Sequence, residues 1–130
     1  MPRGSLALAV LLAGAMMPGP GGARAADPEE VSLVRIIAGP GEWDGRFVRV
    51  YGYFVTDFEG TAIYLHAEDY RNCLYTNGLW VELGPLRGLV PSDCYVLMEG
   101  FFDADEHGHL GLWSGSITGV TRIVAWGGGE

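Results

Sequence analysis

Two long stretches of this chain alternate apolar and polar residues, and each has a glycine near its middle. In RFVRVYGYFV, residues 46–55, every second residue is apolar or small, namely Val48, Val50, Gly52 and Phe54. In CYVLMEGFF, residues 94–102, Gly100 has an equivalent place. A period of two is typical of a strand with one buried face, and an internal glycine predicts a bend or a bulge. Long strands that bend at glycine are what a small closed barrel requires.

Three further segments bring the predicted strands to five. They are AIYLH (62–66), LWVEL (79–83) and GSITGVTRIVAW (115–126), the last with a bulge near Gly119. The stretch GPLRGLVPSD, which precedes the fourth strand, is rich in proline and glycine and predicts a loop. We therefore expect a mainly β fold, a five-stranded OB-like partly open barrel preceded by one N-terminal α-helix. The alternative is an open antiparallel sheet packed on that helix.

The N-terminal helix is predicted over residues 28–38. Asp27 suits the N-cap and Pro28 the first helical position, and the Gly39–Pro40 pair ends the helix. Trp43, in the loop that follows, is expected to pack back on this helix.

The first 25 residues have the pattern of an export signal rather than of a folded element. After Arg3, the apolar run from Ser5 to Met17 has the length of a signal-peptide core and is too short to span a bilayer. Ala23-Arg24-Ala25 suits signal cleavage, so we expect the mature chain to begin at Ala26. The predictions are a periplasmic or secreted protein without membrane insertion after cleavage. One domain is expected over residues 26–126, with a disordered tail at 127–130.

The charge balance of the predicted mature chain is strongly acidic. It keeps six arginines, no lysine and 16 acids, which gives a net charge of −10. A negative field repels nucleic-acid backbones and anionic membranes, so a nucleic-acid partner is unlikely. A protein, peptide or saccharide partner in the cell envelope fits this charge better.

Cys73 and Cys94 are the only cysteines of the chain. In an exported protein such a pair predicts a disulfide, and the alternative is two buried thiols. The bridge would close a loop of about 22 residues, worth about 3 kcal/mol in the chain-entropy account.

Outward aromatic residues on the first three strands are the leading candidates for ligand binding. The alternation places them beside one arginine on a single face, the set being Arg49, Tyr51, Tyr53, Tyr64 and Trp80. In OB folds this face binds oligonucleotides or oligosaccharides, and aromatic rings stack on bases and sugars. The alternative is that these rings belong to the core or are covered by the helix and loops.

Two histidines lie close together in FDADEHGHLGLWSG, residues 102–115. His107 and His109, with His66 or a nearby aspartate, are candidate ligands for a divalent metal such as zinc or copper. The competing interpretation is a solvated hairpin turn over residues 105–108, with Gly108 at a positive φ. Ser114 lacks the sequence pattern of a nucleophile elbow, and no stretch predicts a deep cleft with paired catalytic carboxylates.

From Val31 onward the chain resembles a group of small exported bacterial proteins with OB-like domains and no assigned activity. The segments that carry the resemblance are VSLVRIIAGP, WDGRFVRVYGYF, AIYLHAEDY, GLWVEL and YVLMEGFFDADEHGHLGLWSGSITGVTRI. The resemblance implies an OB-like fold and an exported location, and it supplies no active site. The chain departs from the common OB plan because its helix precedes the first strand.

The function that these patterns favour is an exported, non-enzymatic OB-like binding module that needs no cofactor. It would use the aromatic strand face and the adjoining loops 56–61 and 103–114. The alternative is a metal-binding or metal-dependent protein that uses His66, His107 and His109.

Overall fold

The computed structural model describes residues 26–127. The predicted export signal and residues 128–130 of the predicted tail lie outside the described residues. The strands are β1 (Glu29–Glu30), β2 (Phe47–Val55), β3 (Ala62–Tyr64), β4 (Gly78–Val81), β5 (Cys94–Asp103) and β6 (Ser116–Ala125). The helices are α2 (Leu33–Ala38), α3 (Pro40–Trp43) and α4 (Ala67–Arg71), with 3₁₀ turns η2 (Tyr75–Asn77), η3 (Gly84–Leu86) and η4 (His109–Gly111). Within this range no helix is long and apolar enough to cross a bilayer.

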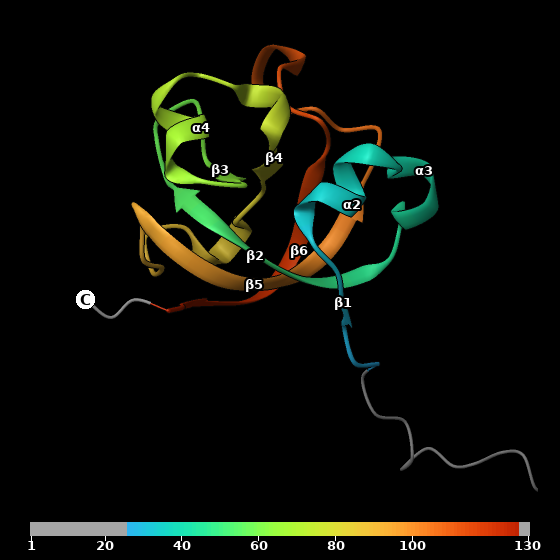
Figure 1. Cartoon of the computed structure of the whole chain (residues 1–130). Coiled ribbons are helices and arrows are strands. Elements are labelled where there is room, and N and C mark those ends of the chain that lie inside the picture. Colours follow the sequence, from blue (N-terminus) through green and yellow to red (C-terminus); the bar gives the residue numbers. More distant parts are fainter. Residues whose placement is uncertain (1–25, 128–130) are drawn as a thin grey trace, which may run out of the picture.

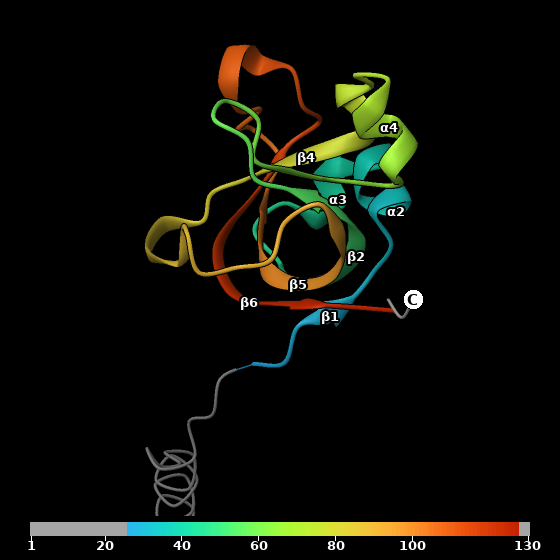
Figure 2. The same cartoon turned by 90° about the vertical axis from the view of Figure 1, so that its left-hand side faces the viewer.

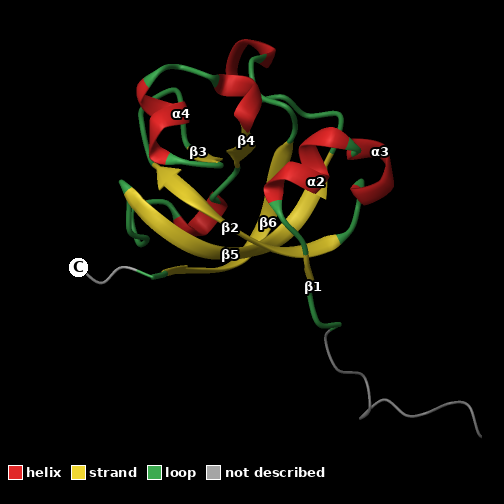
Figure 3. Cartoon of the chain, in the orientation of Figure 1, coloured by secondary structure: helices red, strands yellow, loops and turns green. Residues whose placement is uncertain are grey.

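Five of the strands close into a barrel, as the sequence predicts (Figures 1 and 3). The order is β2-β3-β4-β6-β5, and β5 pairs back with β2 over residues 47–54, which excludes the alternative of an open sheet. Only β4 and β6 are parallel, and the other pairs of the barrel are antiparallel. The expected proline-rich loop joins β4 to β5 and contains only the short turn η3. This is a five-stranded OB-like barrel.

The interior of the barrel follows the predicted alternation. The inward residues of β2 are fully buried, as are Ile63, Leu79 and Val81 on the next two strands. Glu99 and Phe101 flank Gly100 in β5 and pair with Arg122 and Thr118 of β6. Residues 119–121 of β6 therefore lie opposite the single residue Gly100, which is a bulge. The predicted bulge near Gly119 is therefore confirmed, and Gly119 has a φ of +54°.

For Gly52 the sequence predicts a bend or a bulge, and β2 has no bulge there. The register of β2 against β5 runs without a break from Phe47 to Phe54. A Cβ at Gly52 would lie 2.5 Å from the carbonyl oxygen of Tyr64 and 2.9 Å from Cδ1 of Leu33. The glycine therefore lets β3 and helix α2 approach β2 closely, with Leu33 in the core.

The N-terminal helix is shorter than predicted. It begins at Leu33, and the N-cap is Ser32, whose Oγ accepts a hydrogen bond from the Arg35 backbone N–H at 3.2 Å. Residues 28–32 are not helical, and Asp27 is not an N-cap, because Glu29–Glu30 forms strand β1 along β2. In β1 the backbone pairs with β2, the Glu29 carboxylate pairs with Arg46, and the Glu30 carboxylate pairs with Arg49.

Trp43 packs back on the helix, as predicted. Trp43 is 7% exposed, and the guanidinium groups of Arg35 and Arg46 lie over its ring, 5.8 and 4.8 Å from the ring centroid. Its buried Nε1 has no hydrogen-bond partner among the described residues. The contact is therefore held by packing and cation–π attraction rather than by a hydrogen bond.

We expect Gly52→Ala to destabilise the domain by about 3 kcal/mol, because the added methyl group meets backbone on one side and a core leucine on the other. Gly41→Ala is the matched control, since a Cβ at Gly41 meets nothing within 4 Å. This control should be neutral or stabilising by about 0.5–1 kcal/mol. Urea unfolding of the two variants and the wild type measures both effects, and equal midpoints for the two variants would contradict the close approach at Gly52.

Candidate functional site: an aromatic cleft

Tyr64 is the centre of a second hydrophobic cluster on the outside of the barrel. The alternation predicts that its side chain points outward from β3, and Ile63 beside it is indeed in the interior core. Tyr64 is nevertheless 1% exposed and clusters with Val55, Ala62 and Trp113. Its partner on β4 is Gly78, where a Cβ would lie 2.6 Å from the Tyr64 ring. The missing side chain at Gly78 leaves the room that this ring occupies.

Trp113 covers Tyr64 from the loop 104–115. Its indole Nε1 donates a hydrogen bond to the Tyr64 hydroxyl at 3.1 Å. Its ring centroid lies 5.0 Å from that of Tyr75 and 5.0 Å from that of Trp80. Trp113 is only 3% exposed, so the loop is fixed to the barrel wall by a buried aromatic anchor.

Hydrogen bonds within the same loop hold its shape. The ring Nδ1 of His107 lies 2.8 Å from the carbonyl oxygen of Trp113, and the Trp113 N–H donates to the carbonyl of His107 at 3.1 Å. Ser114 donates from Oγ to the carbonyl of Thr76 at 2.7 Å, which ties the loop to the segment before β4. Gly108 has the predicted positive φ, +74°, but the long loop 104–115 joins β5 to β6 in place of the predicted hairpin turn over residues 105–108.

Three segments meet at one end of the barrel and enclose a cleft of about 670 Å³. They are the β2–β3 loop, the α4–η2 segment and the loop 104–115, all at the top in Figures 1 and 2. We call this space the aromatic cleft. Its lining consists of Asp57, Phe58, Glu59, Gly60, Tyr64, Tyr70, Arg71, Cys73, Tyr75, His109, Leu110, Leu112 and Trp113. Its volume lies within the range of small-molecule and peptide side-chain sites.

The hydroxyls of Tyr64 and Tyr70, both in the cleft, are hydrogen-bonded and protonated. Tyr70 donates to Oδ2 of Asp57 at 3.0 Å, and this bond, followed by burial, raises the pKa of Tyr70 above its usual value. Burial raises the pKa of Tyr64 to about 12, against a smaller lowering by the Trp113 hydrogen bond. Both groups therefore remain neutral at physiological pH and are suited to hydrogen bonding rather than to proton abstraction.

Two apolar side chains at the rim of the cleft are exposed to solvent. Phe58 is 91% exposed at the tip of the β2–β3 loop, and Leu110 is 77% exposed in η4. Leu110 also has a left-handed backbone, with φ of +59° and ψ of +13°, which is costly for any residue but glycine. Strained backbone that presents an apolar side chain beside a cleft is characteristic of a binding surface.

Of the five residues predicted to form one ligand-binding face, only Tyr64 lines the aromatic cleft. Tyr64 lines the cleft from below, and Tyr53 and Trp80 pack against the edge of its cluster. Arg49 lies nearer the N-terminal end of β2 and pairs with Glu99 at 2.8 Å and Glu30 at 3.5 Å. The Tyr51 ring packs on that of Trp126, with centroids 4.8 Å apart. Strand curvature separates the two ends of this face, which alternation alone does not predict.

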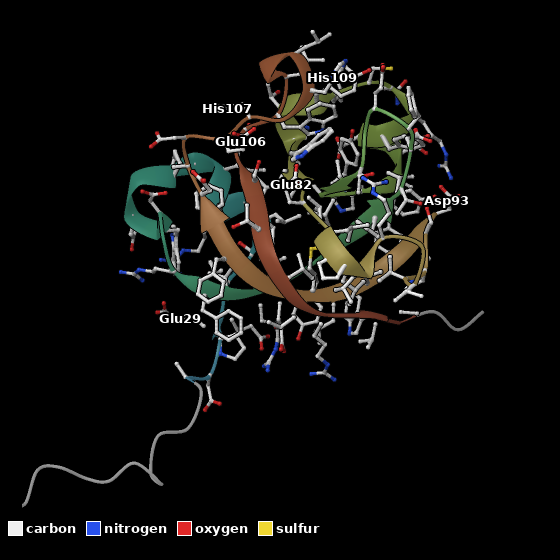
Figure 4. The ribbon with its side chains drawn as sticks, turned by 180° about the vertical axis from the view of Figure 1, so that it is seen from behind. Glu29, Glu82, Asp93, Glu106, His107 and His109 are labelled. Carbon is white, nitrogen blue, oxygen red and sulfur yellow. The ribbon has the colours of Figure 1, made fainter. Side chains whose placement is uncertain are left out.

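The three histidines predicted as metal ligands are not brought together. His66 lies at the start of α4, 3.9 Å from Asp69, and His107 faces the backbone of its own loop. The third, His109, approaches Glu59 at 3.5 Å. Figure 4 shows His107 and His109 on the loop between β5 and β6, with Glu106 beside them. Within residues 26–127, no three histidine, cysteine or acidic residues are grouped to hold a metal ion.

Cys73 and Cys94 are both free thiols, so the predicted disulfide is not formed. Cys73 is exposed and lines the aromatic cleft, whereas Cys94 lines a separate depression with Tyr53, Tyr95 and Trp126. Burial, together with the negative charge of Asp93, raises the pKa of the Cys94 thiol. The two side chains belong to different surfaces, a separation that the spacing of the cysteines in the sequence does not reveal.

The residues that sequence reasoning missed are Phe58, Tyr70, Tyr75, Leu110 and Trp113. Both loops named in the sequence-based prediction, 56–61 and 103–114, border the cleft. The one available signal for the missed residues is the concentration of aromatic residues in and around these loops. Comparison with known proteins adds nothing to the geometry, because no protein family, curated protein or solved structure gives a significant match to the chain.

Thiol titration checks the state of the cysteines. Native protein purified without reductant should release two equivalents of chromophore from Ellman's reagent, one fast and one slow. The fast phase should come from exposed Cys73, and the slow phase from Cys94, whose burial disfavours the reactive thiolate. Cys73→Ser should remove only the fast phase. Release that appears only after reduction would instead indicate a disulfide.

The buried hydroxyl of Tyr64 has a predicted effect on stability at high pH. Its pKa rises from 10.0 in the unfolded chain to about 12, so the unfolded state loses this proton first. The stabilising contribution is complete below about pH 10 and is lost as the pH rises to about 12. Urea unfolding over this range should show a shallower loss of stability in Tyr64→Phe than in the wild type. Parallel curves would contradict the raised pKa.

Proposed function

We propose that this protein is an exported, non-enzymatic binding module whose ligand occupies the aromatic cleft. The observation that carries the proposal is a pair of exposed apolar side chains, Phe58 and Leu110, at the rim of the aromatic cleft. The backbone of Leu110 is strained, and the buried rings of Tyr64 and Trp113 line the cleft. A domain gains no folding stability by exposing these side chains or by straining a leucine. A ligand that covers them removes apolar surface from water on binding.

The position of the cleft in the fold supports the same proposal. In OB-like barrels the loops after the first strand and before the last strand are the common binding loops. Here these are the β2–β3 loop and the loop 104–115, and both contribute walls of the aromatic cleft. The ligand classes that fit are a peptide, an exposed protein segment or a saccharide, because each can stack on aromatic rings and accept or donate hydrogen bonds. The excess of acids over arginines disfavours nucleic acid.

Export is part of the proposal, and its support is the pattern of the first 25 residues of the sequence. A ligand in the cell envelope follows from it. The proposal favours binding over catalysis because the hydroxyls of Tyr64 and Tyr70 are already engaged in hydrogen bonds with Trp113 and Asp57.

A comparison of rim variants tests the proposed function. We expect Leu110→Gly to leave stability unchanged or to raise it by about 1 kcal/mol, because glycine tolerates the left-handed backbone. Leu110→Gly and Phe58→Ser should each weaken ligand binding about 10-fold or more, since each removes an apolar side chain that is buried in the complex. Leu89→Ser is the matched control, because Leu89 is also 77% exposed and does not line the cleft.

The measurement combines defined ligand libraries with NMR. A randomised hexapeptide library and an array of envelope oligosaccharides are screened against the wild-type domain, and hits are titrated into isotope-labelled protein. Chemical shifts should change at Tyr70, Tyr75 and Leu110, and the two rim variants should lose affinity while Leu89→Ser does not. Hits that bind all four proteins equally would place the ligand elsewhere and overturn the proposal.

A further inference from the structure

The mouth of the aromatic cleft has two exposed carboxylates whose hydrogen-bonding capacity is only partly used. Asp57 accepts the Tyr70 hydroxyl at Oδ2, and Glu59 has Oε1 at 3.5 Å from Nε2 of His109. The other oxygen of each carboxylate, Oδ1 of Asp57 and Oε2 of Glu59, accepts no hydrogen bond from residues 26–127. Both acids lie on one short loop with Phe58 between them, so charge and apolar surface are presented together.

The positive groups near the cleft do not neutralise these two acids. Arg71 lines the cleft, and its Nη1 is paired with Oε2 of Glu68 at 2.9 Å. His109 contributes a positive charge only when it is protonated. The described chain as a whole is acidic, with six arginines and no lysine, so its field attracts cations toward a site that already contains carboxylates.

The aromatic rings favour the same sign of charge. Tyr70 and Tyr75 line the wall of the cleft, and Phe58 projects from its rim. The face of an aromatic ring carries partial negative charge and attracts ammonium and guanidinium groups. A long basic side chain also has an apolar stem, which can cover ring surface while its charged end remains beside a carboxylate.

We propose that the aromatic cleft binds an arginine or lysine side chain of a peptide segment, with the charged end beside Asp57 and Glu59. The stem of this side chain packs on Phe58 and the tyrosine rings, and a neighbouring apolar residue of the peptide covers Leu110. The inference rests on the proposed binding function and names its ligand class. A basic peptide fits this cleft better than a neutral saccharide does, because two carboxylates and several aromatic rings line the same cleft.

Selection followed by neutral substitution tests the ligand class. A phage-displayed hexapeptide library is selected on the immobilised wild-type domain, and we expect arginine or lysine to be enriched at one position next to an apolar residue. One selected peptide is then synthesised with arginine and with citrulline, which keeps the shape and removes the charge. Titration calorimetry should show at least 10-fold weaker binding of the citrulline peptide, and affinity for the arginine peptide should fall as salt increases.

Charge variants locate the contact. Glu59→Gln and Asp57→Asn should each weaken the arginine peptide about 5-fold or more, and should leave the citrulline peptide nearly unaffected. Glu42→Gln is the control for net charge, because Glu42 is an exposed acid of α3 outside the cleft. Since Asp57 also accepts the Tyr70 hydroxyl, Glu59→Gln keeps the test valid if Asp57→Asn unfolds. A loss of affinity as large in Glu42→Gln as in Glu59→Gln would overturn the proposed contact.

The outcomes separate the ligand class from the proposed function. If neutral peptides or saccharides bind as tightly as basic ones, and Leu110→Gly still abolishes their binding, the preference for a cationic side chain is wrong and the binding function stands. If no library member binds, or if the rim variants Leu110→Gly and Phe58→Ser bind as tightly as the wild type, both the ligand class and the proposed function are wrong.

Discussion

The hydrogen bond from the Trp113 indole to the Tyr64 hydroxyl is the contact on which the aromatic cleft depends. It joins the loop 104–115 to the outer face of β3, two segments that no strand pairing connects. It acts together with the packing of the Trp113 ring on Tyr75 and Trp80 and with the Ser114 bond to Thr76, which also hold the loop on the barrel. A net contribution of about 1 kcal/mol from such a bond is small beside the burial of the two rings that it aligns. Its importance is geometric, because it fixes where the cleft is.

The barrel was largely predictable because its signals are local. Strand alternation specifies which side chains of β2 and β4 are interior, and the bulge at Gly119 follows from a break in that alternation. The start of the helix was not predictable from its capping residues. Strand β1 pairs with a part of β2 that β3 does not reach, so a tertiary contact overrides a favourable N-cap at Asp27. The intrinsic preference of these residues for a helix is small, and a tertiary contact such as this strand pairing can override it.

The site was only partly predictable, since it depends on contacts between distant segments. Alternation gave the direction of the Tyr64 side chain correctly, and its burial depends on a tryptophan 49 residues away. The spacing of His107 and His109 suggested a shared ligand, yet one faces its own backbone and the other faces Glu59. The left-handed conformation of Leu110 is invisible in the sequence, because leucine gives no signal for positive φ. Alternation and turn signals therefore predict where the loops lie, but not which of their side chains meet in space.

The distribution of charge connects the fold to the proposed ligand. Most of the arginines are committed to structural contacts, either with acids or over the Trp43 ring, the set being Arg35, Arg46, Arg49, Arg71 and Arg122. The Glu99 carboxylate pairs with both Arg49 and Arg122 on the outer wall of the barrel. Positive charge is thus used where it supports the strands and helices, and several acids without an arginine partner lie on loops, Asp57 and Glu59 among them. Asp57 and Glu59, two of these acids, lie at the mouth of the aromatic cleft, where their charge favours a cationic ligand of the kind proposed.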